Sequence, residues 1–299
     1  MSVSAPVPIA PAVRQGVVAD LREIAGDLKQ HRDLLYQLTL RDIRIRYKQA
    51  VMGFGWAVLM PVLIVVSGLL VRLAVSYVSD RPVDTGTVAG IAVKAIPWGF
   101  FVSAIGFATT SLTGNSTLVS KIYFPREVLP LSAVFAAAFD SLLGTAAVLL
   151  ALLFILDANF SLAALWAVPV MLLMFILTVA AALFLSCANL FFRDVKYLVQ
   201  IMLTFGIFFT PVFFDATMFG PVGAQIAMLN PLAPLLEGVR LSVVEGHNLL
   251  HPLVETVRGT PVTAWHPWYL AYSATWALGG LFISALLFHR SEFIFAEYV

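Results

Sequence analysis

The stretch RDIRIRYKQAVMGFGWAVLMPVLIVVSGLLVRLAVSYV, residues 41–78, decides the fold class of this chain. Four basic residues fall within its first eight positions, and an almost uninterrupted apolar run follows from Ala57 to Val78. A transmembrane helix needs about 20 apolar residues, and basic residues beside a span mark its cytoplasmic side. The stretch therefore predicts a first membrane span that is preceded by a cytoplasmic segment.

The composition of the 299 residues is that of a membrane protein. Hydrophobic residues make up 60% of the chain and charged residues 12%, with a mean hydropathy of +0.92, whereas soluble domains carry about 25% charged residues. These values exclude an ordinary water-soluble enzyme and a disordered chain. The 18 basic and 17 acidic residues nearly cancel, and we expect no nucleic-acid partner. A single cysteine, Cys187, excludes an internal disulfide.

Six apolar segments predict an all-α polytopic membrane protein with six transmembrane helices. They cover residues 57–78, 95–119, 128–156, 161–190, 197–214 and 268–289. An even number of spans places both termini on one side of the membrane. The positive-inside rule agrees, because 13 basic residues then lie on the cytoplasmic side and 5 on the other. We therefore expect both termini in the cytoplasm, with the span count open by one hairpin.

The segments outside the spans complete the predicted organisation of a 57–299 transmembrane domain. Residues 1–15 are expected to form a flexible tail, and residues 16–56 an amphipathic interface helix followed by a basic elbow. The helix either lies on the bilayer surface or packs on a partner. Residues 215–266 contain five prolines and apolar stretches too short to span. They predict short re-entrant helices between spans five and six, or an extracytoplasmic loop that folds on its own.

Motifs of common catalytic and metal sites are missing from the sequence. It contains no G-x-x-x-x-G-K, no H-E-x-x-H and no C-x-x-C, so we expect neither nucleotide hydrolysis nor a metal site in this chain. Ion-driven carriers keep buried ionisable relays, and within the predicted spans only Asp140 fits that description. Asp140 either faces a hydrated lumen or dimer interface, or makes a packing hydrogen bond to a serine or threonine on a neighbouring span. These observations favour a passive path with an external source of energy.

Aromatic residues are dense in and beside the predicted spans. Their rings could stack on sugars along such a path, or they could face lipid and neighbouring helices. The candidates for lining a glycan path are Trp56, Phe100, Phe101, Phe107, Phe205, Phe208, Phe209 and Phe213.

Four motifs in order along the chain resemble the membrane subunits of type-2 ABC transporters that export polysaccharides, such as O-antigen or teichoic acid. They are RDIRIRYKQAVMGFGWAVLMP (residues 41–61), NSTLVSKIYFPREVLPL (115–131), NLFFRDVKYLVQ with TPVFF downstream (189–200 and 210–214) and LNPLAPLLEGVR (229–240). The resemblance runs from about Leu38 to the end of the chain. The tail before Gly16 and the stretch 246–266 are longer than the usual pattern.

This resemblance implies a permease subunit of an ATP-driven exporter that moves a lipid-linked polysaccharide across a bacterial inner membrane. It implies a homodimer bound to two copies of a separate ATP-binding subunit, which would hold ATP and magnesium. This chain would then contain no cofactor and no catalytic residue. The rival functions are a type-2 ABC exporter of small hydrophobic compounds and, in another class, a membrane enzyme that modifies lipid-linked glycans.

Two groups of residues are the candidate sites under this hypothesis. A lipid phosphate would pair with the basic residues before the first span, because arginine favours such groups; these are Arg41, Arg44, Arg46 and Lys48. The resemblance places contacts with the ATP-binding subunit between spans two and three and also before span five. In the first of these segments two prolines bracket a short turn, which is expected to present two protruding aromatic residues and a basic one at the membrane edge. The candidate contact residues are Lys121, Tyr123, Phe124, Pro125, Arg126, Arg193 and Asp194. The alternative for the first segment is a plain cytoplasmic loop, and for Arg193 and Asp194 it is a surface pair that stabilises the start of the next helix.

Overall fold

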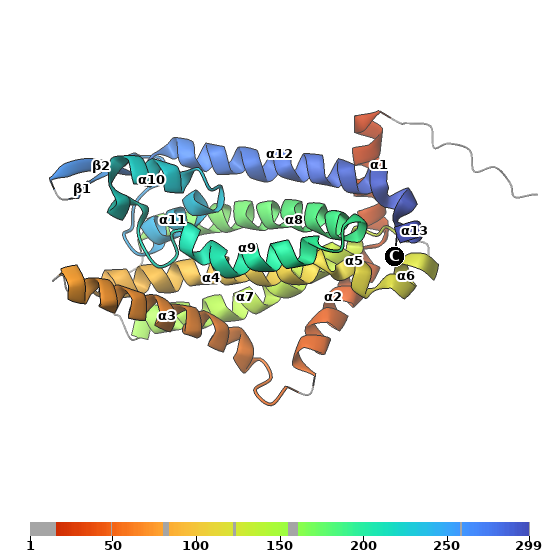
Figure 1. Cartoon of the computed structure of the whole chain (residues 1–299), viewed down its shortest axis with the longest axis horizontal. Coiled ribbons are helices and arrows are strands. Elements are labelled where there is room, and N and C mark those ends of the chain that lie inside the picture. The colour runs from red at the N-terminus through yellow and green to blue at the C-terminus, as the bar shows by residue number, and fades with distance from the viewer. Residues whose placement is uncertain are drawn as a thin grey trace, which may run out of the picture.

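A computed structural model describes residues 16–48, 50–79, 84–121, 124–154, 161–257 and 259–298. Long helices run side by side along the long axis of the molecule (Figure 1). They are α3 (Gly55–Ser79), α4 (Thr85–Thr109), α7 (Val128–Phe154), α8 (Ala167–Phe191), α9 (Val195–Phe209) and α12 (Pro267–Ser291). The prediction of an all-α polytopic membrane protein is confirmed for the bundle. The predicted tail, residues 1–15, lies outside the described residues.

Five segments of the described chain are long and apolar enough to cross a membrane. They are α3, α4, α7, α8 together with the preceding short helix η1 (Leu162–Trp166), and α12 together with the following η3 (Glu292–Ile294). The predicted fifth span is represented by α9, whose 15 residues give a length of about 22 Å, below the hydrocarbon thickness of about 30 Å. The helix stops at Thr210 because Pro211 disfavours a helical residue before it. A sixth complete span thus remains a prediction.

The second span begins ten residues earlier than the sequence predicted. Asp84 caps α4, since its side chain accepts a hydrogen bond from the backbone N–H of Thr87. The helix then continues through Lys94 and Pro97 to Thr109. The polar run that follows breaks into two short helices, α5 (Ser111–Gly114) and α6 (Ser116–Lys121). Lys94 is therefore inside the span and not at its boundary.

The amino-terminal segment forms two helices where the sequence predicted one amphipathic helix followed by a basic elbow. Helix α1 (Val17–Gln30) ends at His31, and α2 (Arg32–Tyr47) carries the basic cluster on a helix instead of an elbow. In Figure 1, α1 crosses α12 near the end of the bundle where α5, α6 and the carboxyl-terminal α13 (Phe295–Tyr298) also lie. The two ends of the described chain therefore share one end of the molecule.

Residues 215–266 form a compact cap at the opposite end. Short helices are present as predicted: η2 (Ala216–Phe219), α10 (Gly220–Met228) and α11 (Leu232–Val243). A hairpin that the sequence analysis did not predict follows, with β1 (Leu253–Val257) antiparallel to β2 (Thr260–Trp265). Gly259 adopts a φ of +80° in its turn, a conformation that favours glycine. Trp265 is fully buried and donates to the carbonyl of Leu249 at 2.9 Å, which anchors the hairpin to the cap.

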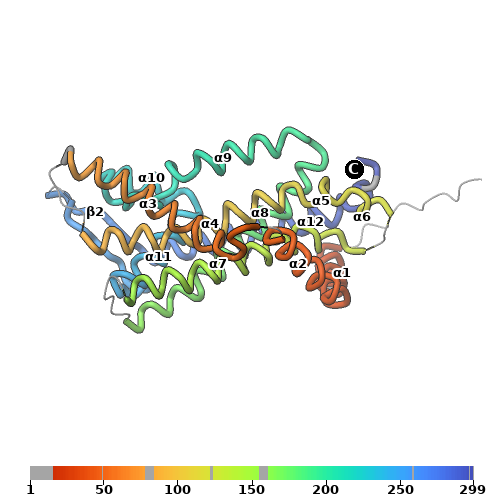
Figure 2. The backbone as a smooth tube through the Cα atoms, turned by 90° about the horizontal axis from the view of Figure 1, so that it is seen from below, coloured from red at the N-terminus to blue at the C-terminus, as the bar shows by residue number. Residues whose placement is uncertain are grey.

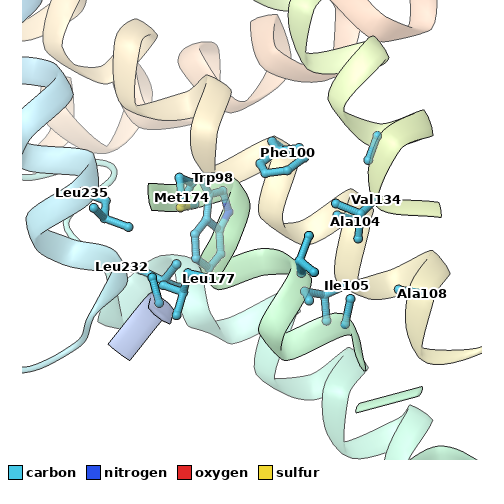
Figure 3. Packing of buried hydrophobic residues seen from close by; sticks show 14 of the residues in the cluster. Trp98, Phe100, Ala104, Ile105, Ala108, Val134, Met174, Leu177, Leu232 and Leu235 are labelled. Carbon is cyan, nitrogen blue, oxygen red and sulfur yellow. The ribbon is translucent and has the colours of Figure 1, made fainter. Parts of the chain in front are cut away.

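Helix α4 lies at the centre of the core. In Figure 3 Ala104 lies beside Val134 of α7, and Trp98 lies beside Met174 and Leu177 of α8 and Leu232 of α11. Small residues such as Ala104 and Ala108, both fully buried, let neighbouring helices approach closely, which favours packing within lipid. In contrast, α9 runs along one flank of the bundle (Figure 2).

Candidate functional site

The basic residues before the first span differ in how far their charges are already paired. Arg46 forms an ion pair with Asp140 of α7, and its guanidinium also lies 4.0 Å from the centroid of the Phe107 ring. The hydroxyl of Tyr47 donates to the other oxygen of Asp140. Burial raises the pKa of Tyr47, and the carboxylate of Asp140 raises it further. Asp140 thus joins α2 to α7, a role that neither sequence alternative described.

The remaining three basic residues of this group divide in the same way. Arg41 pairs with Asp42 at 2.9 Å, and Asp42 also accepts a hydrogen bond from Ser132 of α7 at 2.8 Å. Arg44 and Lys48 are exposed, and in the described part of the chain neither has a carboxylate within ion-pair distance. Arg44 and Lys48 therefore provide unpaired positive charge, whereas Arg46 ties α2 to α7 and Arg41 is neutralised by its neighbour Asp42.

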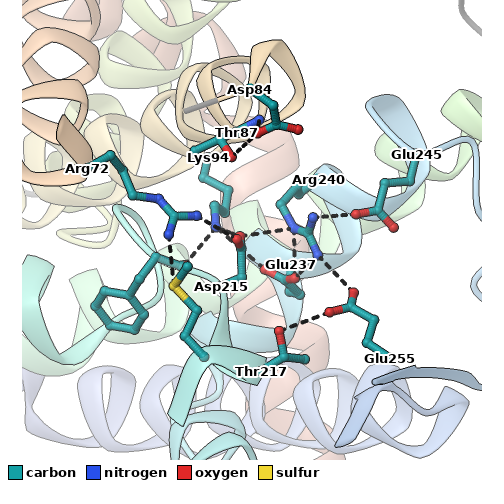
Figure 4. A network of polar contacts seen from close by, with 12 residues as sticks. Arg72, Asp84, Thr87, Lys94, Asp215, Thr217, Glu237, Arg240, Glu245 and Glu255 are labelled. Carbon is teal, nitrogen blue, oxygen red and sulfur yellow. Dashed lines mark hydrogen bonds and ion pairs between the residues drawn. The ribbon is translucent and has the colours of Figure 1, made fainter. Parts of the chain in front are cut away.

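A network of charged residues lies at the other end of the bundle, where the cap meets α3 and α4 (Figure 4). Asp215 is its centre and contacts Arg72 at 2.8 Å, Lys94 at 3.1 Å and Arg240 at 3.5 Å. Burial alone would raise the pKa of Asp215, but Lys94, Arg240 and Arg72 together lower it well below its usual range. The segment between α9 and η2 is thus tied to three helices.

Helix α11 contributes the second carboxylate of this network. Glu237 is 1% exposed, pairs with Arg240 and lies 3.6 Å from the ammonium of Lys94, which is also 1% exposed. Arg240 extends further to Glu245 and to Glu255 of β1. Burial raises the pKa of Glu255, although its hydrogen bond with Thr217 and the charge of Arg240 oppose this.

Gly90 makes room for Arg240 to cross α4. A Cβ at this position would lie 3.2 Å from Cδ of Arg240, a tighter contact than most side chains make. An open cavity of about 420 Å³ adjoins the network, and its lining includes Asp84, Asp215, Arg240, Glu245 and Glu255. The sequence analysis missed this network. Arg72 and Lys94 within apolar runs were the available signal, because charges in a span generally have partners.

The predicted coupling segment between spans two and three packs inward. Phe124 is 7% exposed and Pro125 is buried, so Phe124 does not protrude as expected. The backbone N–H of Arg126 donates to Glu292 Oε1 at 3.1 Å, and its guanidinium donates to the carbonyls of Glu292 and Val119. Lys121 is exposed at the end of α6. Tyr123 lies outside the described residues.

The second predicted contact, Arg193 and Asp194, is exposed at the same end of the molecule. Arg193 and Lys196 line a cavity of about 330 Å³, together with Thr113, Ser116, Asn189 and Tyr298. Asn189 fixes this corner, because its side-chain oxygen accepts from the backbone N–H of Lys196 at 3.1 Å. The cavity thus presents two cations beside polar side chains.

A second groove of about 570 Å³ continues from Lys196 between α4 and α9. Its lining combines hydroxyl and amide groups with apolar surface: Val102, Gly106, Thr109, Thr110, Lys196, Tyr197, Val199, Gln200, Leu203 and Thr204. Such a surface can hydrogen-bond to hydroxyl groups while also contacting apolar faces, as sugar rings require.

The aromatic candidates fall into two sets. The rings of Phe100 and Phe213 are buried, at 4% and 6% exposure, and Phe100 stacks on Phe175 with centroids 6.1 Å apart. These two side chains belong to the core and do not present a ring to a passage. Phe101 is partly buried. The exposed candidates are Trp56, Phe107, Phe205, Phe208 and Phe209.

Comparison with known proteins gives a family match over most of the chain. The family model described as ABC-2 type transporter matches residues 33–244. An O-antigen export system permease protein of Klebsiella pneumoniae is 29% identical over 205 residues, which are 68% of this chain and 77% of that protein. The protein of the same name from Myxococcus xanthus is 28% identical over 250 residues, covering 81% of this chain and 92% of its own length.

Proposed function

The chain belongs to the ABC-2 type transporter family, and on that premise we propose that it is the membrane permease subunit of an ABC exporter for O-antigen or a similar lipid-linked polysaccharide. The observation that carries the proposal is the extended match to permeases named for O-antigen export, up to 92% of one relative's length. The chain is a multi-pass protein of the bacterial inner membrane with both termini in the cytoplasm. Its part in export is transport and not catalysis.

The groove between α4 and α9 supports a path for a sugar polymer. Thr109, Gln200 and Thr204 supply hydrogen-bonding groups along it, and Phe205 and Phe208 of α9 are exposed. Rings and hydroxyls in alternation bind sugars weakly at many points, which suits a chain that has to slide. The polymer passes along this flank of the subunit.

A second copy of the chain completes the passage. Helix α3 leaves large apolar side chains exposed, including Leu63, Val66 and Leu70, and the exposed face of α9 adjoins the sugar groove. Because one subunit forms only an open groove, a homodimer encloses the polymer between two such flanks. Arg44 and Lys48 hold the phosphate of the lipid carrier where it approaches the dimer from the membrane.

The energy comes from two copies of an ATP-binding subunit that hold ATP and magnesium. Their docking surface is the cavity around Arg193 and Lys196, extended by Lys121, because these cations are exposed at the end of the bundle that faces the cytoplasm in the predicted topology. Arg126 supports the helix that carries Lys121, because its guanidinium donates to the carbonyl of Val119 in α6. Movement of the ATP-binding subunits is transmitted to α9 directly, since Lys196 lies in its first turn.

Deletion of the chain in its native host tests the proposed function. We expect surface polysaccharide to be lost while lipid-linked polymer accumulates inside the cell, and both effects to be reversed by the wild-type chain. Purified chain with its ATP-binding partner in proteoliposomes should hydrolyse ATP faster with lipid-linked polymer. Stimulation by small hydrophobic compounds alone would indicate the drug-exporter alternative. Glycan modification by this chain without any ATPase would indicate the enzyme.

A further inference from the structure

Three metal-ligating side chains meet where α1 crosses the end of α12. Glu127 precedes α7, His289 lies in the last turn of α12, and Glu292 begins η3. One ligand atom of each lies within 4.8 Å of the others. We propose that Glu127, His289 and Glu292 bind one zinc ion. This proposal does not depend on which substrate the protein transports.

The separation between two of the ligands fits a zinc ion. His289 Nδ1 lies 3.4 Å from Glu127 Oε1, longer than the usual 2.7–3.2 Å of an N–H···O hydrogen bond. Ligands bound at about 2.0–2.2 Å to a tetrahedral ion are roughly 3.3–3.6 Å from each other. Glu292 must move inward by about 1 Å to complete the set. Its Oε1 is held by the backbone N–H of Arg126, so Oε2 is the ligand atom.

A carboxylate of α1 faces the second ring nitrogen of His289, Nε2, and can orient the ring. Nε2 faces Glu23 Oε2 of α1 at 3.8 Å. Histidines that bind a metal through one nitrogen commonly donate the other N–H to a carboxylate, which fixes the tautomer and the ring plane. Glu23 lies on the correct edge of the ring for that role and must approach by about 0.6–1 Å to accept the hydrogen bond, which leaves Nδ1 to bind the ion beside Glu127.

Burial and charge both favour a divalent cation here. Glu127 is 4% exposed, and among the described residues its carboxylate has only the 3.4 Å contact with His289. A buried carboxylate with so little compensation is costly. With the imidazole of His289 neutral, as a metal ligand must be, the carboxylates of Glu23, Glu127 and Glu292 carry three negative charges around it. The guanidinium of Arg126, which donates to the carbonyls of Glu292 and Val119, supplies one positive charge nearby. Two negative charges are left over, and one divalent ion neutralises them.

The chemistry of the ligands selects zinc over magnesium. One imidazole nitrogen and two carboxylates, with a water in the fourth position, form a set that zinc accepts, whereas magnesium requires oxygen ligands in octahedral geometry. The Glu23 side chain is 51% exposed, so the ion reaches the site from solvent. Bound zinc links the end of α12 and η3 to the segment before α7, and α1 is attached to the site only through the contact of Glu23 with His289.

Zinc content measures the proposal directly. The chain is purified without a histidine tag in detergent, dialysed against buffered Zn²⁺ and analysed for metal, and Co²⁺ is substituted to record the visible absorption of a tetrahedral site. We expect one zinc per chain. His289→Ala and Glu127→Gln should weaken binding at least tenfold, and the matched control His247→Ala, at the opposite end of the molecule, should not.

The variant Glu23→Gln keeps the proposal testable if the buried variants His289→Ala and Glu127→Gln fail to fold. This half-exposed side chain does not touch the ion, so the variant should fold normally and bind zinc about tenfold more weakly. Less than half a zinc per wild-type chain would overturn the proposal. Equal zinc binding by wild type and all variants, or magnesium binding as tight as zinc, would overturn it as well.

Discussion

Lys94 is an almost fully buried charged residue in the bundle. Its replacement by methionine tests whether its charge stabilises the network around Asp215. The ammonium group is 1% exposed and interacts with the carbonyl of Phe214 at 2.9 Å, Asp215 at 3.1 Å and Glu237 at 3.6 Å. Methionine fills nearly the same space without the charge. Lys94→Met therefore removes the electrostatic contacts while largely preserving the packing of α4.

The expected cost follows from the partners that remain. Asp215 keeps Arg72 and Arg240, but the buried Glu237 is left with Arg240 alone, and its Oε2 already makes no hydrogen bond. Removing one partner of a buried pair costs about 3–5 kcal/mol because the other charge is left uncompensated. Because Asp215 retains two of its partners, we expect Lys94→Met to lower the free energy of unfolding by about 3 kcal/mol, the lower end of that range.

Removing the uncompensated charge of Glu237 should restore much of the lost stability. In the double variant Lys94→Met/Glu237→Gln the uncompensated carboxylate is gone, and the amide oxygen introduced at position 237 can still accept from Arg240. Since replacing both members of a buried pair is often nearly neutral, the double variant should be more stable than the lysine variant by about 1–2 kcal/mol. A network in which Lys94 contributes only packing gives no such rescue.

The assay is unfolding of the detergent-solubilised protein, followed by thermal denaturation and by titration with a denaturing detergent. For a chain of this size a loss of about 3 kcal/mol lowers the Tm by about 6–12 °C. Lys196→Met, an exposed lysine at the opposite end, is the matched control and should change stability by less than about 0.5 kcal/mol. A Tm for Lys94→Met that equals that of wild type, or a double variant less stable than either single one, would refute the reasoning.

Four other outcomes are expected. Arg193→Glu/Lys196→Glu should reduce co-purification of the ATP-binding subunit without affecting membrane insertion; undiminished co-purification would contradict the docking surface. Asp140→Asn should cost about 1.5–3 kcal/mol and speed hydrogen exchange in α2, and unchanged exchange would count against the tie to α7. Leu250→Cys should react with impermeant reagents only from outside the cell, since labelling from the cytoplasm reverses the topology. The low pKa of Asp215 stabilises the fold above about pH 4, and that contribution declines as pH falls below this value, so Asp215→Asn should show a smaller acid-induced loss.

The bundle was predictable from sequence because apolar length is a local property. The boundaries of α3, α7 and α12 lie within two residues of those predicted, and the short helices after α9 follow from the prolines of residues 215–266. The hairpin formed by β1 and β2 is held by long-range burial of Trp265, which no local pattern records.

The candidate sites were predictable only in part, since their partners are distant in the chain. Arg46 lies 94 residues from Asp140, and Arg126 lies 166 residues from Glu292. A basic residue next to a span has the same local sequence pattern whether it binds a phosphate or already pairs with an acidic residue of another helix. Sequence therefore could not separate Arg44 and Lys48, which are exposed, from their paired neighbours Arg41 and Arg46.

The position of Lys94 also changes how the positive-inside count is used. Counted as a loop residue it opposed the predicted orientation, yet it lies nine residues into α4, about 14 Å from the start of the helix. Inside a span, beside Asp215 and Glu237, its charge is compensated by protein and does not choose a side of the membrane. Without Lys94 the basic residues divide 13 to 4, so the buried lysine strengthens the predicted topology that it seemed to weaken. A span that holds a compensated charge must fold against its partners as it inserts, which ties the stability of α4 to the cap that supplies them.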